Sequence, residues 1–256
     1  MNKLLTGLFS SILLVGSAAT MAQVIVTPDD GQGWFADEQA GSATGSISVA
    51  QPRGAGTGSL EFITTGNIAD QLSAVKVPTP LVKLSKISGV GYDFYASDPV
   101  RGPAIKLWYL GGNVFPFSGV LIYEPGENGA YPVGAWVSRQ NVVAGNWWLS
   151  SEPAGPRKTL TQWGMDLGDP TVSFLRAGVG SGWNVATTSY VDLVTLNGTT
   201  WDFEATPTAG PLPPEPAPTP TAPEVVSTMS AYGLVVTMLG LFFVAARRIR
   251  ASAKRD

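Results

Sequence analysis

The stretch Ala104-Ile105-Lys106-Leu107-Trp108-Tyr109-Leu110 has the clearest period-two alternation in the chain. Alternation of this kind predicts a β-strand. Residues 91–95 (GYDFY) and 119–124 (GVLIYE), on either side of it, have the same pattern. No long amphipathic period of 3.6 residues appears, so we expect the central part of the chain to be all-β.

Further short segments of this kind extend over most of the chain. We expect strands at residues 24–26, 59–63, 134–137, 146–149, 171–180, 189–196 and 200–204, a loop at 51–58, and a short helix at 159–163 capped by a threonine. The Asn-Gly pairs 128–129 and 197–198 predict tight turns. Short strands at regular spacing, separated by turn residues, predict a β-sandwich.

The composition excludes several kinds of site. The 256 residues contain no cysteine and no histidine, which excludes disulfides, Ser-His-Asp and Cys-His catalysis, and zinc sites of the usual kind. The net charge is −3, and much of the positive charge lies in the C-terminal tail. The remainder is therefore acidic, which argues against nucleic acid as a partner.

The N-terminal residues have the order of a signal peptide. Lys3 supplies the charged region, residues 4–16 are apolar, and small residues precede Ala22. We expect a signal peptide at 1–22 that is cleaved after Ala22, followed by one β-sandwich domain at 23–205. An uncleaved N-terminal membrane helix is the alternative.

Residues 206–224 are rich in proline and cannot form a core. We expect an extended, polyproline-like stalk, about 50 Å long at ~3.1 Å per residue. A plain interdomain linker is the alternative.

Residues 225–256 have the composition of a membrane segment. An uncharged run of roughly 20 residues, the length that crosses a bilayer, precedes a basic cluster. The cluster consists of Arg247, Arg248, Arg250, Lys254 and Arg255. Basic residues favour the cytoplasmic side, so we expect one transmembrane helix with the body of the protein outside. A buried core helix is a further alternative.

The start of this tail, VSTMSAYGL, resembles the IPTL-type C-terminal sorting signal, a relative of the PEP-CTERM signals that exosortases read. The residues that carry the resemblance are Val226, Ser227, Thr228, Met229, Ser230, Tyr232, Gly233 and Leu234, with Ser227 in place of the usual proline and Tyr232 in place of tryptophan. The resemblance implies an exported protein that the inner membrane holds until a sorting protease of the exosortase type releases it to the envelope or surface. Arg247, Arg248 and Arg250 would be its basic stop. A plain membrane anchor is the alternative.

A second resemblance covers about residues 58–204. The segments at 58–60, 91–95, 177–183 and 190–194 are similar to those of jelly-roll modules of the carbohydrate-binding or galactose-binding type. This similarity implies a jelly-roll sandwich. Leu193 stands where a polar residue is usual, and this departure argues against a metal ion at this position.

Trp147, Trp148 and Trp183 are the candidate ligand-binding residues because they lie beside glycine and asparagine. Exposed rings would stack on sugar faces and bind a polysaccharide. The alternative is that they belong to the core, in which case the protein would be a structural surface protein without a ligand.

Asp192 is a candidate for a structural Ca²⁺, with a hydrogen bond to a loop backbone as the alternative. A glycosidase-like enzyme with two carboxylates is a third hypothesis for the function. Its candidate residues are Asp93, Asp98, Glu124, Glu127, Glu152, Asp166, Asp169 and Asp192. The sequence favours a protein that is not an enzyme.

Overall fold

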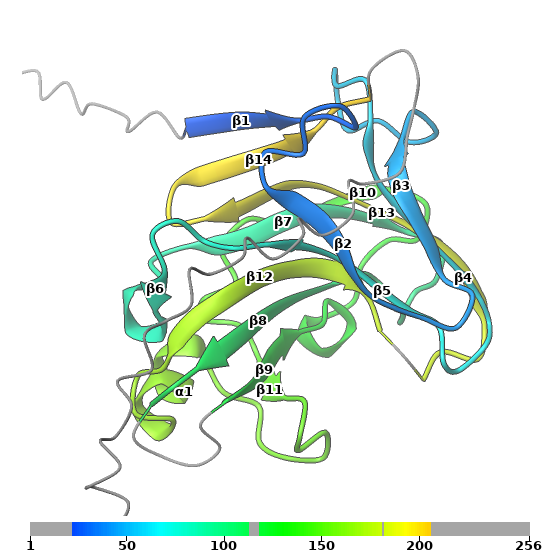
Figure 1. Ribbon diagram of the computed structural model, residues 1–256. Helices are drawn as coiled ribbons and strands as arrows, with labels where there is room; N and C mark the ends of the chain where they lie inside the picture. The colour runs from blue at the N-terminus through cyan, green and yellow to red at the C-terminus, as the bar shows by residue number, and fades with distance from the viewer. Residues whose placement is uncertain (1–21, 113–117, 181, 206–256) are drawn as a thin grey trace, which may run out of the picture. The chain divides into compact units, whose positions relative to one another are not determined.

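The computed structural model describes residues 22–112, 118–180 and 182–205. These residues form two β-sheets that pack against each other around a common core (Figure 1). The prediction of an all-β, two-sheet sandwich is confirmed.

Sheet A has β13 (Ala186–Leu196) as its longest strand. β13 pairs with β4 (Ser59–Thr65), β7 (Val90–Ala96) and β14 (Thr199–Phe203). β3 (Thr44–Ser48) and β10 (Trp136–Arg139) lie beside β4 and β7. β1 (Ala22–Val26) pairs with β14 in parallel, while the other pairs of this sheet are antiparallel.

Sheet B is antiparallel, in the order β11 (Trp147–Leu149), β9 (Ser118–Tyr123), β8 (Ala104–Leu110), β12 (Thr171–Val179), β5 (Gln71–Lys76) and β2 (Trp34–Ala40). The short strand β6 (Val82–Lys83) pairs with the start of β12. The strand that decided the fold prediction, β8, therefore lies inside a sheet and is paired on both sides.

Three short helical segments connect the strands. They are η1 (Leu84–Lys86), η2 (Gly126–Asn128) and α1 (Leu160–Asp166). Thr159 caps α1, and its hydroxyl accepts the backbone N–H of Gln162 while the Gln162 side chain accepts the N–H of Thr159. This reciprocal pair satisfies two free donors of the first turn, so the predicted helix with a threonine cap is confirmed.

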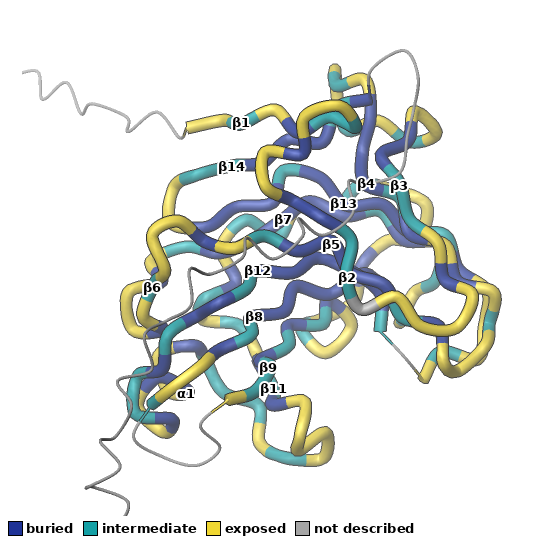
Figure 2. Tube along the Cα trace, in the orientation of Figure 1, coloured by how far each residue is buried: buried dark blue, intermediate teal, exposed yellow. Residues whose placement is uncertain are grey.

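Aromatic side chains join the two sheets. Trp34 of β2 lies 5.6 Å from Trp201 and 5.2 Å from Phe203 of β14, measured between ring centroids. Tyr92 of β7 meets Tyr123 of β9 edge to face. Figure 2 shows buried residues along the middle of both sheets, as expected for strands that each turn one face to a shared core.

The two Asn-Gly pairs behave differently. Asn197 and Gly198 both have positive φ and join β13 to β14 in a tight hairpin, as predicted. Asn128 and Gly129 also lie in a tight turn, because Asn128 ends the 3-10 turn η2 and its N–H donates to Pro125 O, but they close no hairpin, since the next strand, β10, pairs with β7. The Asn128 amide instead donates to Glu124 O and Asn146 O and bridges two loops.

Several parts of the organisation predicted from the sequence lie outside the described residues. These parts are the signal peptide up to residue 21, the stalk at 206–224, and the sorting and anchoring tail at 225–256. Within the described part of the chain, no helix has both the length and the apolar character that a bilayer span requires.

The hairpin asparagine provides the first test. Asn197→Ala should lower the free energy of unfolding by about 1–3 kcal/mol. The Asn197 side chain accepts from Ser88 N and donates to Lys86 O, and the backbone of the residue has a φ of 48°. Asn141→Ala, at an exposed residue with one long hydrogen bond to Val143 N, is the matched control. Chemical denaturation measures both, and equal losses would contradict the role given to Asn197.

Candidate functional site

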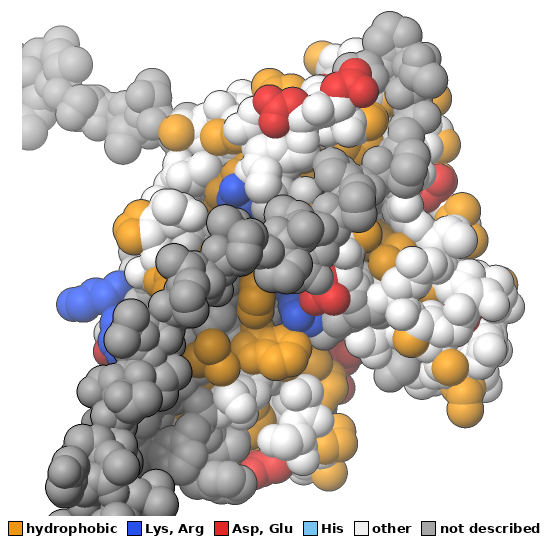
Figure 3. All heavy atoms as spheres, in the orientation of Figure 1, with side chains coloured by type: hydrophobic (Ala, Val, Ile, Leu, Met, Phe, Trp, Pro, Cys, Tyr) orange, Lys and Arg blue, Asp and Glu red, His pale blue; other side chains and the backbone are white. Residues whose placement is uncertain are grey.

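A hollow of about 260 Å³ lies on the outer face of sheet B. We call it the face hollow; its lining residues are Gln71, Ala104, Lys106, Val120, Ile122, Glu124, Trp148, Ser150, Gly180 and Trp183. In the view of Figure 3, hydrophobic side chains gather over the region of β8 and β12, with basic and acidic side chains beside them.

The strand register explains why these residues meet. Ile105, Leu107 and Tyr109 of β8 are fully buried in the core, so Lys106 points to the opposite face. Lys106 pairs with Ile122 of β9, and Ile122 pairs with Trp148 of β11. Directly paired residues share one face of a sheet, so these three form a row across the floor of the face hollow.

The two adjacent tryptophans of β11 have opposite roles. Trp147 is 0% exposed, donates from Nε1 to Val142 O at 2.8 Å, and packs against Tyr123. It therefore belongs to the core, and the structure corrects its assignment as a candidate ligand-binding residue. Trp148 points outward because successive side chains of a strand alternate between the faces.

Trp148 and Trp183 line the face hollow together, although 35 positions separate them in the sequence. Trp148 is half-buried, and its indole N–H lies beside the Glu124 carboxylate, where it opposes the rise that burial causes in the pKa of Glu124. The Arg157 guanidinium lies 5.3 Å from the centroid of the Trp148 ring and forms an ion pair with Glu127 at 3.0 Å. The ring is thus held from outside the face hollow while its polar edge lies beside Glu124.

Two ionisable side chains line the face hollow. Lys106 is 5% exposed, and burial lowers its pKa to about 8, against the opposing charges of Glu124 and Asp37. Its ammonium lies 3.3 Å from Ser73 Oγ. Burial also raises the pKa of Glu124, and the neighbouring charge of Glu127 adds to this shift. Both charged forms are therefore disfavoured by the site that holds them.

The outer face continues beyond the face hollow to residues that the sequence analysis did not single out. Trp108 and Phe174 are paired on β8 and β12 and meet edge to face at 6.1 Å. The Arg176 guanidinium lies 4.6 Å from the Trp108 ring centroid and forms a 2.8 Å ion pair with Asp37. The alternation in residues 104–110 puts Trp108 on the same face as Lys106, and this signal could have identified it.

Of the eight carboxylates considered for glycoside hydrolysis, Glu124 alone lines the face hollow. Several others have structural partners: Asp93 with Arg53, Asp98 with Arg101, Glu127 with Arg157, Asp166 with Lys158 and Asp169 with Ser85. The described lining of the face hollow therefore does not contain the two carboxylates of a glycosidase site.

Asp192 lies away from the face hollow, on β13. Its Oδ1 accepts from Leu193 N and Phe203 N, both at 2.8 Å, and its Oδ2 is buried without a partner among the described residues. Both donors belong to strands, β13 and β14, and not to the loop backbone that the alternative for this residue named. No group of three or more acidic side chains in the described part of the chain is placed to hold a metal ion, and the binding of Ca²⁺ by Asp192 stays a prediction.

Comparison with known proteins gives a likeness of fold. No protein-family model and no curated protein matches the chain. The described sandwich is similar to solved carbohydrate-binding modules. A family 11 module of a cellulosomal cellulase of Clostridium thermocellum is 14% identical, with a TM-score of 0.39 over 67% of this chain and 88% of that one.

A CBM4 structure is 18% identical, with a TM-score of 0.37 over 66% of this chain and 96% of that one. A third structure, from work on the promiscuous specificity of β-sandwich carbohydrate-binding modules, is 11% identical with a TM-score of 0.35. That match covers 64% of this chain, which spans 56% of the other chain's length.

The buried carboxyl of Asp192 makes stability depend on pH. Burial, aided by the charge of Asp202, raises its pKa to about 8 in the folded protein, far above its ordinary value. The folded state then keeps a proton that the unfolded state releases, so the free energy of unfolding should fall as pH rises from about 4 to 8, by about 1–3 kcal/mol. Asp192→Asn should flatten this slope in denaturation series with a chelator present.

Asp98→Asn is the matched control, because backbone N–H groups and Arg101 lower the pKa of Asp98 and leave it charged throughout this range. An unchanged slope in Asp192→Asn would contradict the assignment. Addition of Ca²⁺ at pH 8 tests the cation prediction: a higher melting temperature that Asp192→Asn abolishes would support it.

Proposed function

We propose that the face hollow binds a polysaccharide chain and that the protein is a non-enzymatic glycan-binding protein of the cell envelope. The observation that carries this proposal is the pair Trp148 and Trp183, which border one hollow together with the buried Lys106 and the half-buried Glu124. Ligand sites typically combine an apolar, aromatic lining with a few well-placed polar groups.

The chemistry of a sugar ring matches this lining. Its C–H face is apolar and packs on indole rings, while its hydroxyls both donate and accept hydrogen bonds. Lys106 and the Trp148 indole N–H are donors, and the Glu124 carboxylate between them is an acceptor. A hydroxyl-rich ligand can form hydrogen bonds with groups of both kinds.

Burial of the two ionisable groups supports a functional role over a purely structural one. A charge with a perturbed pKa beside a hollow costs stability, and an apolar residue of similar size would fit the face at lower cost. The basic Lys106, Arg157 and Arg176 are balanced by the acidic Asp37, Glu124 and Glu127. This balance favours a neutral polysaccharide.

The proposal extends to fold type and location on the strength of the sequence. The segments at 58–60, 91–95, 177–183 and 190–194 support a jelly-roll arrangement. The charged, apolar and small residues of 1–22 support export, and the motif at 226–234, with the apolar run and basic cluster that follow it, supports sorting from the inner membrane to the surface.

Binding measurements with the full-length chain test the glycan site. Trp148→Ala should weaken binding to a polysaccharide identified on a glycan array by about tenfold, because it removes about 1.4 kcal/mol or more of ring stacking. Trp136→Ala, at a half-buried tryptophan on sheet A, is the matched control and should leave the affinity unchanged. Equal effects of the two changes, or no array binding at all, would favour a structural surface protein without a ligand.

Lys106→Met separates function from stability. At pH 7 the folded protein holds a buried ammonium whose pKa of about 8 is lower than in the unfolded chain, so charge on this residue opposes folding. The variant should gain about 1–2 kcal/mol at pH 7, a gain that shrinks as pH rises from 8 toward 10.5 and the unfolded lysine also loses its proton. The same variant should bind the polysaccharide more weakly. A variant that is less stable than the original protein and binds the polysaccharide with the same affinity would contradict the proposal.

A further inference from the structure

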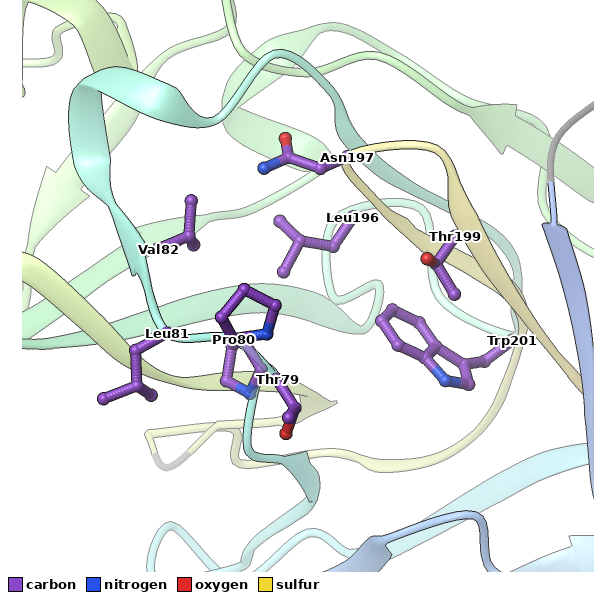
Figure 4. A pocket seen from close by; sticks show the side chains of 9 residues that line it. Thr79, Pro80, Leu81, Val82, Leu196, Asn197, Thr199 and Trp201 are labelled. Carbon is purple, nitrogen blue, oxygen red and sulfur yellow. The ribbon is translucent and has the colours of Figure 1, made fainter. Parts of the chain in front are cut away.

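A second hollow, of about 320 Å³, opens at the end of the sandwich near the β13–β14 hairpin. We call it the end hollow; its lining residues are Pro78, Thr79, Pro80, Leu81, Val82, Leu196, Asn197, Thr199 and Trp201. It shares no lining residue with the face hollow. Figure 4 shows Leu81 at its left and the Trp201 indole at its right, with Pro80 and Leu196 between them.

Trp201 is a rigid wall of the end hollow. Its ring packs edge to face on Trp34, which is 1% exposed and fixed in the core. Opposite it lie prolines and branched aliphatic side chains, among which Leu81 is 55% exposed, and Thr79, Asn197 and Thr199 add polar groups to the lining. Grooves lined by aromatic side chains are sites at which proline-rich segments bind, since these segments are already extended and lose little entropy.

The charges around the end hollow are mostly positive. Its lining contains no acidic side chain. The Lys76 ammonium lies 6.0 Å from the centroid of the Trp201 ring, Lys83 follows Val82 in β6, and the Lys86 carbonyl accepts from the lining residue Asn197. The Asp169 carboxylate, near the start of β12, accepts from Ser85 N and Oγ. A segment that suits this site is apolar, proline-rich and acidic.

We propose that residues 210–215 of this same chain, Gly-Pro-Leu-Pro-Pro-Glu, bind in the end hollow. The segment has three prolines, one leucine and one acidic residue, and it has no basic residue. Its apolar side chains match the Trp201 ring and the aliphatic wall, and Glu215 matches the lysines. This inference does not depend on the proposed glycan site.

The connection along the chain is short. The described residues end at Ala205, four residues after Trp201, or roughly 13 Å at the rise of a strand. Residues 206–214 span about 28 Å as a polyproline helix, enough to return to the end hollow. A covalent tether of this length gives the segment a local concentration of the order of millimolar, so even weak contacts lead to occupancy.

The absence of cysteine makes the test direct, because introduced cysteines are the sole thiols of the full-length chain. Leu81→Cys combined with Pro214→Cys should form an intrachain disulfide under dilute oxidising conditions, followed by non-reducing electrophoresis and mass spectrometry. Ile68→Cys with Pro214→Cys is the exposed-site control, since Ile68 is 64% exposed at the other end of β5. We expect the first pair to form its disulfide about tenfold faster.

Two further variants separate docking from simple tethering. Replacing Pro211, Leu212 and Pro213 with serine in the Leu81→Cys, Pro214→Cys chain leaves the tether length and the folded domain unchanged, and should slow the reaction severalfold. Thr199→Glu, which adds a negative charge to the lining, should also slow it at an unchanged melting temperature. Equal rates in the serine variant would overturn the proposal. Disulfides that form mainly between chains, at rates that rise with concentration, would assign the end hollow to a second copy and overturn it as well.

Discussion

The register of sheet B is the constraint on which the candidate site depends. Ile105, Leu107 and Tyr109 bury one face of β8 completely, and this burial fixes which residues of β9 and β12 lie opposite. A slip of one residue would turn Lys106 into the core and expose the aliphatic side chains, at a cost of several kcal/mol. The core face therefore determines which side chains lie on the outer face of sheet B.

Buried charges are tolerated on the outer face because each has a specific neighbour. The Arg176 guanidinium combines an ion pair with Asp37 and two aromatic contacts, to Trp108 and Phe174. A planar guanidinium suits this place because it pairs at its edge and stacks on its face. Lys106 has a compact charge, so burial lowers its pKa instead.

Local sequence patterns predicted the fold better than they predicted the site. β8 and β9 formed where alternation indicated them, and the Thr159 cap was readable because capping depends on neighbours three residues apart. β5, with four consecutive buried residues, was missed because it does not alternate. Alternation within residues 146–149 puts Trp147 and Trp148 on opposite faces, but which of the two rings enters the core depends on the pairing of β11 with β9, which no local pattern encodes. The position of Trp148 beside the same hollow as the distant Trp183 is likewise a result of the tertiary fold.

Without disulfides, the chain joins its sheets through rings. The contacts of Trp34 with Trp201 and Phe203 link β2 to β14, the edge regions of the two sheets, and Tyr92 and Tyr123 repeat the arrangement between β7 and β9. Each edge-to-face pair adds about 0.5–1.5 kcal/mol beyond the area that it buries. Trp201 has two structural roles, because it packs on Trp34 and also lines the end hollow. A side chain that the core already holds rigid gives a ligand contact at little further cost in entropy. The noncovalent link between the sheets therefore also preorganises the surface at this end of the domain.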